Sequence, residues 1–283
     1  MLRQVLLQGY ALAHLGHRRP ELALPALRYR YREALKRFVA KRASIKLPAG
    51  PLIVLGDGVW FRFKRRPWVL YLTALRSTSG HIAVFLDPVL LPGQEGAFKW
   101  EATIQRIPGR IQRRIRAIVV DNLNGMKKLA KRRGWHLQLC HFHLLLKLQV
   151  QYRRKRRALI GGAIRETIYR LVRGAIELPA AQAAEATAQL EQIVATGFCT
   201  MRLDAVIRDF LWSVPFYRSY LKHPELNLPS TTNVLESMAR IVREMLRRNR
   251  SGSSPESLLR WVTALIRLRP RMTCNRSPIN RNT

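Results

Sequence analysis

Acidic residues are scarce in this sequence: 17 Asp and Glu stand against 51 Lys and Arg in 283 residues, a formal net charge of +34. A folded chain this basic repels itself unless an anion compensates the charge, and the usual polyanion is nucleic acid. The alternatives are a solvated basic surface, as on a ribosomal protein, and attachment to an anionic membrane. We find no basic amphipathic anchor isolated at a terminus, so the charge favours a nucleic-acid partner.

Cysteine and long apolar runs are also lacking. The three cysteines, Cys140, Cys199 and Cys274, have no C-x-x-C spacing, which excludes a disulfide framework and makes a reducing cytoplasm the expected location. No apolar run reaches the roughly 18 residues of a membrane span, and no convincing signal peptide opens the chain. Hydrophobic residues still make up 47% of the sequence, enough for the core of one large or two small domains.

The apolar pattern predicts strands that alternate with helices. Strands are predicted over 51–57, 68–75, 81–86, 115–120 and 136–140, the first three as an antiparallel meander with turns at 64–67 and 77–80. Helices are predicted over 26–43, 96–107, 126–133, 142–157, 233–249 and 255–268, with only helical patterning over 158–222. The last fifteen residues are expected to fray. This order predicts a mixed α/β layer.

Two of the scarce acids end apolar runs: Asp57 follows 51–56 and Asp121 follows 115–120. A carboxylate at the end of a buried strand is costly unless water or a cation stabilises it. If the two strands lie side by side, the carboxylates converge and offer the oxygen ligands that Mg²⁺ or Mn²⁺ prefers. The alternative is that both acids begin turns, which Asp-Asn-Leu-Asn-Gly at 121–125 also favours.

A third acid, Glu236, lies three residues after Asn233, the spacing of a capping box in which Asn233 caps the helix and Glu236 reaches back. The apolar stripe of this helix consists of Leu235, Met238, Val242 and Met245. Glu236 lies on another face, in a row with Arg240, Arg243 and Arg247. Such a face can offer a metal ligand and phosphate contacts together, and both interpretations can hold at once.

Cys140 and His143 have the spacing of metal ligands. No second pair of ligands follows them, so a buried cysteine with a nearby histidine is favoured over a zinc site.

Four stretches of sequence occur in an order typical of a known family. They are LIVLGDGVW around Asp57, IVVDNLNGMKKLAKRRGW around Asp121, LQLCHFHLLLKL around Cys140, and TTNVLESMARIVREMLRRNRSG around Glu236. Together they resemble a DDE transposase of a bacterial insertion sequence, from the Mutator-like superfamily. That family carries a C-x-x-H motif after the second Asp and an N-x-x-E on a helix after an all-helical insertion. The resemblance covers 51–268, most of the chain.

The resemblance implies an α/β fold: a ribonuclease H-like mixed sheet core with an all-helical insertion. The first and fourth strands of that fold are adjacent, which implies that Asp57, Asp121 and Glu236 together hold two Mg²⁺ (or Mn²⁺) ions. Asn233, Cys140 and His143 are the implied supports of this active site. The implied organisation is a short basic helical segment (1–50), the first part of the core (51–150), the insertion (151–230), the C-terminal core helices (231–268) and a basic tail (269–283).

The implied activity is metal-dependent hydrolysis at an element end, after which the freed 3′ hydroxyl attacks target DNA. The implied partners are double-stranded DNA, at element ends and target, and a second copy of the chain; a bacterial nucleoid location and no membrane are expected. The groups expected to bind backbone phosphates are Lys64, Arg65, Arg66, Arg153, Arg154, Lys155, Arg156, Arg157, Arg240, Arg243 and Arg247.

Two departures from the family pattern leave alternatives open. About fifty residues precede Asp57, without a Cys pair. Either the reading frame is shortened at its start, or recognition of element ends rests on 28–42 and the helical block. A catalytically inactive or truncated nucleic-acid-binding descendant, and a nuclease or resolvase of the same fold, remain rivals.

In the helical block, Trp212 is expected to pack in the core rather than to stack on an unpaired base.

Overall fold

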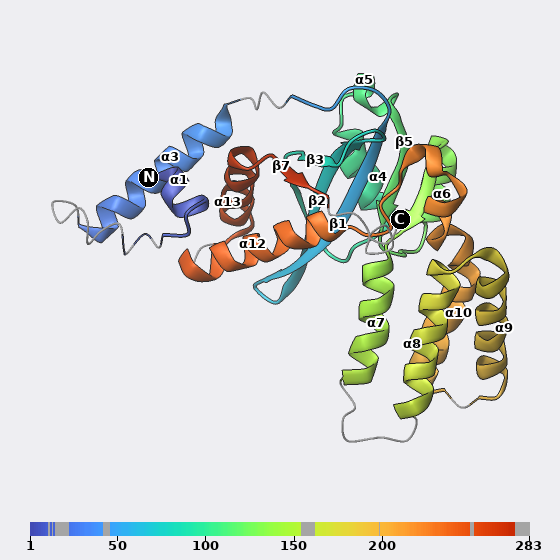
Figure 1. Ribbon diagram of the computed structural model, residues 1–283. Coiled ribbons are helices and arrows are strands. Elements are labelled where there is room, and N and C mark those ends of the chain that lie inside the picture. The colour runs from blue at the N-terminus through green and yellow to red at the C-terminus, as the bar shows by residue number, and fades with distance from the viewer. Residues whose placement is uncertain are drawn as a thin grey trace. The chain divides into compact units, whose positions relative to one another are not determined.

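The computed structural model (Figure 1) describes residues 1–10, 12, 14, 23–41, 46–153, 162–197, 199–249 and 252–274. The chain divides into two compact units. The first is built from Met1–Ile115 and the segment that begins at Asn233, and the second is built around Arg116–Thr232. Both contain helices and strands, so the fold is mixed α/β, as predicted.

The first unit contains an antiparallel sheet. Strand β1 (Leu52–Phe63) pairs with β2 (Arg66–Ser77) along its whole length, and β2 pairs with both β3 (Ile82–Phe85) and β4 (Val89–Pro92). Strand β7 (Arg271–Thr273) joins the free edge of β3. The run Leu52–Leu55 is fully buried, which explains why its side chains are apolar without alternation.

Helices cover this sheet. Helix α12 (Asn233–Asn249) packs against β1 and β2, and α13 (Pro255–Leu268) packs against α1 (Leu2–Leu6) and α3 (Leu24–Ala40). The stripe predicted for α12 is its buried face. Helix α4 (Ala97–Gln105) contacts β2 through Trp100, whose ring meets that of Tyr71 edge-on at 4.9 Å, and the short α5 (Gly109–Gln112) follows.

The second unit joins a parallel strand pair to a group of helices. Strands β5 (Ile115–Val120) and β6 (His136–Leu139) are parallel and are connected by α6 (Met126–Arg133). A helical connection of this kind is what parallel strands require. The helices that follow are α7 (His141–Arg153), α8 (Gly162–Glu177), α9 (Ala180–Ala195), α10 (Met201–Tyr217), α11 (Ser219–Lys222) and the 3₁₀ turn η1 (Pro224–Leu226). The described part of the stretch predicted as helical consists of these helices and the short turns between them.

Three local predictions are wrong. Strand β4 was not predicted, because its four residues follow a proline and carry a weak pattern. Strand β7 forms within the stretch expected to fray, because the edge of β3 offers it hydrogen-bonding partners. The turn expected at 64–67 is tighter: pairing runs to Phe63 and Arg66, so two residues make the turn.

Candidate active site

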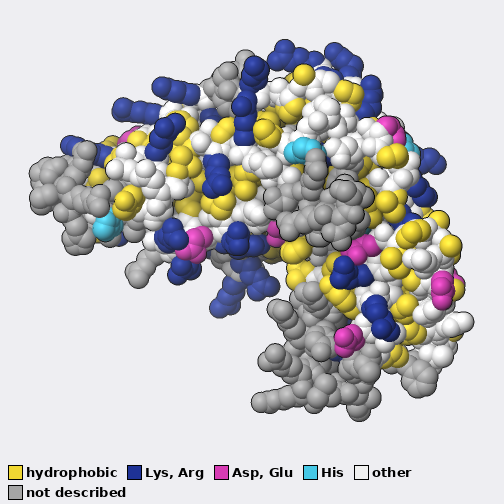
Figure 2. Space-filling model, viewed as in Figure 1, with side chains coloured by type: hydrophobic (Ala, Val, Ile, Leu, Met, Phe, Trp, Pro, Cys, Tyr) yellow, Lys and Arg dark blue, Asp and Glu magenta, His cyan; other side chains and the backbone are white. Residues whose placement is uncertain are grey.

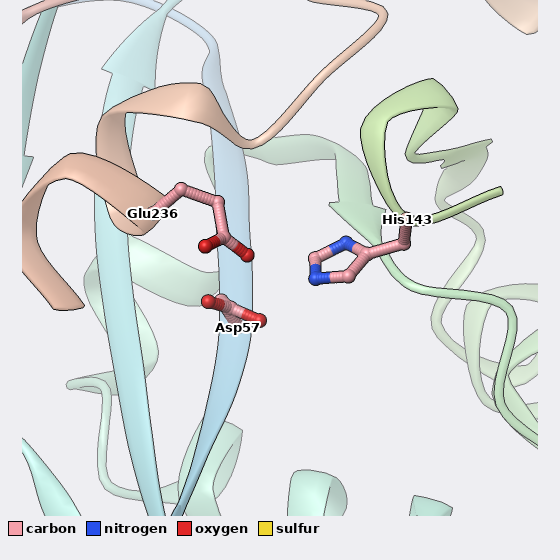
Figure 3. A group of neighbouring side chains, drawn as sticks. All are labelled: Asp57, His143 and Glu236. Atoms are coloured by element: carbon pink, nitrogen blue, oxygen red, sulfur yellow. The ribbon is translucent and has the colours of Figure 1, made fainter. Parts of the chain in front are cut away.

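Two of the predicted acids meet in the first unit. Contrary to the prediction, Asp57 does not end its strand: β1 continues to Phe63, because its pairing with β2 runs on past Asp57, which lies opposite Leu72. Asp57 is 7% exposed, and Glu236 lies in the first turn of α12. Their carboxylate oxygens lie within 4.8 Å of each other. Figure 3 shows the two carboxylates facing one another, one from the strand and one from the helix. Residues 179 positions apart in sequence are thus brought together.

The packing of α12 explains this encounter. Its buried stripe anchors the helix on β1 and β2, which leaves Glu236, beside that stripe, half-buried at the boundary of the contact. Helix α12 begins at Asn233 itself, one residue earlier than a cap at that position would allow. Glu236 therefore sits where a helix N-terminus favours a negative charge, while its carboxylate lies beside that of Asp57.

Asp121, the third predicted ligand, belongs to the second unit and directly follows β5. The Lys147 ammonium of α7 donates to its Oδ1 at 3.1 Å, and the Asn122 backbone N–H donates to the same oxygen at 2.6 Å. Asn122 in turn donates through Nδ2 to Asp209 on α10 at 2.8 Å. The acid is thus fixed by partners on its own loop and on a neighbouring helix. No motif or spacing in the sequence pointed to Lys147.

A buried tyrosine lies beside this loop. Tyr217, at the end of α10, is 1% exposed. Burial, followed by the charges of Asp121 and Asp209, raises the pKa of Tyr217 well above its usual value. Its hydroxyl therefore stays protonated at neutral pH and adds a neutral group rather than a further negative charge to the surroundings of Asp121.

Cys140 and its neighbours tie the end of β6 to the segment before α12. The Cys140 thiol lies 3.2 Å from the Thr232 hydroxyl and accepts the Thr232 backbone N–H at 3.3 Å. The His141 N–H donates to the Ser230 carbonyl at 2.9 Å. The chain is thus held one turn before Glu236. His143, also drawn in Figure 3, lies half-buried in the first turn of α7.

The pair of carboxylates has the chemistry of a divalent cation site. Two like charges this close repel each other by a few kcal/mol at the effective dielectric of a protein boundary, and Asp57 is too buried for water alone to screen it. A hard cation with oxygen ligands removes that repulsion. The two carboxylates therefore offer the oxygen ligands that Mg²⁺ or Mn²⁺ prefers.

The predicted phosphate-binding residues lie in three places. Lys64, Arg65 and Arg66 are exposed at the end of the β1–β2 hairpin, and Arg240, Arg243 and Arg247 are exposed on α12. Of these, Arg247 is engaged by Glu244 at 2.8 Å. Residues 154–157 lie outside the described residues, and of Arg153 only its place in α7 is described.

Trp212 corrects the expectation of core packing. It is 82% exposed on α10, because the buried face of that helix is formed by Leu203, Ile207, Phe210 and Tyr217, and Trp212 lies off it. An apolar residue in a helical stretch is thus not by itself a core residue.

The comparison with known families agrees with these motifs. Residues 88–269 match the family described as "Transposase, Mutator family", and the chain belongs to that family. The match includes Asp121 and Glu236, whereas Asp57 precedes it. Membership implies transposition of DNA and therefore DNA binding. No curated protein matches the chain. Among the described helices, none has the length and apolarity that crossing a membrane requires.

Proposed function

We propose that this transposase is a DDE enzyme with a ribonuclease H-like core, and that Asp57, Asp121 and Glu236 hold its divalent metal ions. The observation that carries the proposal is the approach of the Asp57 and Glu236 carboxylates to within 4.8 Å. Asp121 directly follows strand β5 and is the third acid of the proposed metal-binding set. The core would comprise 51–150 and 231–268, separated by the helical insertion.

When bound, Mg²⁺ or Mn²⁺ supplies Lewis-acid activation of a phosphodiester and of the attacking water or 3′ hydroxyl. The role of the protein residues is to hold the acidic side chains in position and to orient them. Asp57 and Glu236 are fixed by a central strand and a packed helix, so little reorganisation is needed. Lys147 neutralises and orients Asp121, and Cys140 with Thr232 fixes the chain that leads into α12.

Exposed arginines next to the carboxylates suit the substrate. Arg240 and Arg243 follow Glu236 by one and two turns on the exposed side of α12, where they can bind phosphates on either side of a scissile bond. Contacts of this kind position DNA without reading its sequence. A homodimer, which would hold two element ends, and association with the bacterial nucleoid belong to the same proposal.

The experiment uses a labelled duplex that carries the element's own end, incubated with Mn²⁺ and target plasmid. The proposal expects cleaved strands and strands joined to the plasmid, both abolished by Glu236→Gln. Cleavage without joining would favour the nuclease or resolvase rival. DNA binding with neither product, on the element's own ends, would favour the inactive descendant.

A further inference from the structure

The β1–β2 hairpin is longer than the sheet that supports it. Its two strands pair without interruption from Leu52 with Ser77 to Phe63 with Arg66. Strand β4 covers the edge of β2 only from Trp68 to Tyr71. The part of the hairpin beyond the Phe61–Trp68 pair therefore projects past β4, and Figure 1 shows the end of the hairpin extending away from the other strands of the first unit. We call residues 60–66 the hairpin tip.

The turn of the hairpin tip has an unfavourable sequence for its conformation. Lys64 and Arg65 both have left-handed backbones, with φ of 48° and 65°, the signs of a two-residue type I′ turn. Asn-Gly is the sequence that suits this turn, because longer L side chains pay a conformational cost there. Two long cations are thus retained where local preference is against them, which points to a function for their side chains.

The charge of the hairpin tip is uncompensated. Arg62 and Arg66 flank the turn, and all four cations are exposed. Within the described part of the chain none of them forms an ion pair, and the sequence has no acid between Asp57 and Asp87. Figure 2 shows Lys and Arg side chains gathered at the lower margin, where the tip lies in Figure 1. A polyanion is the complementary partner.

Aromatic residues stiffen the same ribbon. The rings of Phe63 and Trp68 meet edge-on at 6.0 Å across the strands, which stabilises pairing close to the turn. Trp60 is 50% exposed on the other face of the ribbon and offers apolar surface two residue pairs before Arg62. The tip is therefore a stiff two-stranded ribbon with a cationic end.

We propose that the hairpin tip enters the major groove of duplex DNA, with its four cations on the phosphates and base edges that line the groove. A two-stranded ribbon fits the major groove, about 12 Å wide, whereas the minor groove is about 6 Å wide. This inference rests on the proposed function for its partner, DNA, and adds which element binds it and where. The strained turn is then the consequence of placing two cations at the leading end.

The decisive variant is Lys64→Asn with Arg65→Gly, which installs the favoured turn sequence and removes two cations. We expect its melting temperature to rise by a few degrees while its affinity for duplex DNA falls about tenfold or more. The slope of log affinity against log salt should become shallower by about 2, one contact for each cation removed. Opposite changes in stability and binding cannot come from a damaged fold.

Two controls isolate position and charge. Arg110→Gln with Arg113→Gln removes the same charge from exposed positions at α5 and should change affinity less than threefold. Lys64→Arg with Arg65→Lys keeps both charges and the unfavourable turn sequence, so its slope of log affinity against log salt should stay steeper than that of Lys64→Asn with Arg65→Gly. Equal losses in the α5 variant and the hairpin variant would overturn the inference, because the effect would then be one of net charge.

Groove probes test the docking mode on the wild type. Methyl green, which occupies the major groove, should displace the protein from duplex DNA, and distamycin, which occupies the minor groove, should not. The reverse result would overturn the inference. If the hairpin variant binds DNA as wild type while Glu236→Gln still abolishes cleavage, the inference fails and the proposed function stands. Wild type that binds no DNA would refute the proposed function as well.

Discussion

Asp57 is a buried acid whose carboxylate lies close to that of a second acid, Glu236. It is 7% exposed, and the Glu236 carboxylate lies within 4.8 Å. An arrangement of this kind is unstable without a cation or a shared proton. At the scale of the residue, the proposed metal site therefore rests on a repulsion between two carboxylates that a bound divalent cation would relieve.

This repulsion predicts metal-dependent stability. Millimolar Mg²⁺ or Mn²⁺ should raise the melting temperature of the wild type, since a ligand at 100 times its Kd stabilises by about 2.7 kcal/mol. Asp57→Asn should melt no lower than the metal-free wild type, because one negative charge is gone, and should lose the metal-induced rise. Differential scanning fluorimetry with EDTA controls measures both, and an unchanged wild-type curve would count against the site.

A second residue-scale prediction concerns His141. It is 4% exposed, its Nε2 lies 2.7 Å from the Tyr217 carbonyl, and burial lowers its pKa to about 4. Glu177 and Arg218 are the charged groups that act on it, in opposite directions. Because the unfolded chain protonates near pH 6.5 and the folded one does not, the stability contributed by neutral His141 is present above that pH.

That contribution should be lost as the pH falls from about 6.5 to about 4, by on the order of 3 kcal/mol. Urea denaturation at several pH values, compared with His141→Gln, measures it. The variant can still donate to the Tyr217 carbonyl but does not titrate, so its stability should fall less steeply over this interval. Parallel curves would contradict the assignment.

At the scale of the element, periodicity predicted four elements with their observed boundaries. Strand 115–120 and helices 126–133, 233–249 and 255–268 were predicted with the bounds that the structure shows. These elements have strong patterns and clear ends: α6, for example, is closed by Gly134 at a φ of 64°. Strand β7 was missed because its stability comes from pairing with β3, about 190 residues away, which no local pattern contains.

A group of hydrogen bonds around Arg267 also joins several elements, and the sequence alone could not predict it. Arg267 of α13 donates to the Asp87 carboxylate at 2.9 Å and to the carbonyls of Val39 and Lys41 at 2.7 and 2.6 Å. Its side chain is 13% exposed. One planar guanidinium thus joins α13, the end of α3 and the segment after β3.

Arg267→Met should destabilise the protein by about 1–3 kcal/mol, because it leaves an acid and two carbonyls without their donor. Arg267→Lys should recover only part of this loss, since one ammonium cannot reproduce the planar fork. Chemical denaturation measures the free energy of unfolding of the wild type and of both Arg267 variants. Arg260→Met, at a half-buried position of the same helix, is the control and should cost less than about 1 kcal/mol.

At the scale of the whole molecule, composition and motif order identified the class of protein. Which side chains contact the predicted acids could be learned only from the three-dimensional structure. The charge of +34 indicated nucleic acid, and the motif around Glu236 placed an acid beside a row of arginines. The contact of Glu236 with Asp57 and the ion pair of Asp121 with Lys147 depend on tertiary packing. Neither the exposure of Trp212 nor the strain at Lys64 could be predicted from residue type.

The central claim is that Asp57 and Glu236 belong to one metal-dependent site that cuts DNA. Its most direct test is nicking of supercoiled plasmid in Mn²⁺ by wild type, Asp57→Asn, Glu236→Gln and, as a charge-matched control, Glu191→Gln on the exposed side of α9. We expect the wild type and Glu191→Gln to nick the plasmid. We expect Asp57→Asn and Glu236→Gln to bind DNA without nicking it. Equal nicking by all four proteins would contradict the central claim.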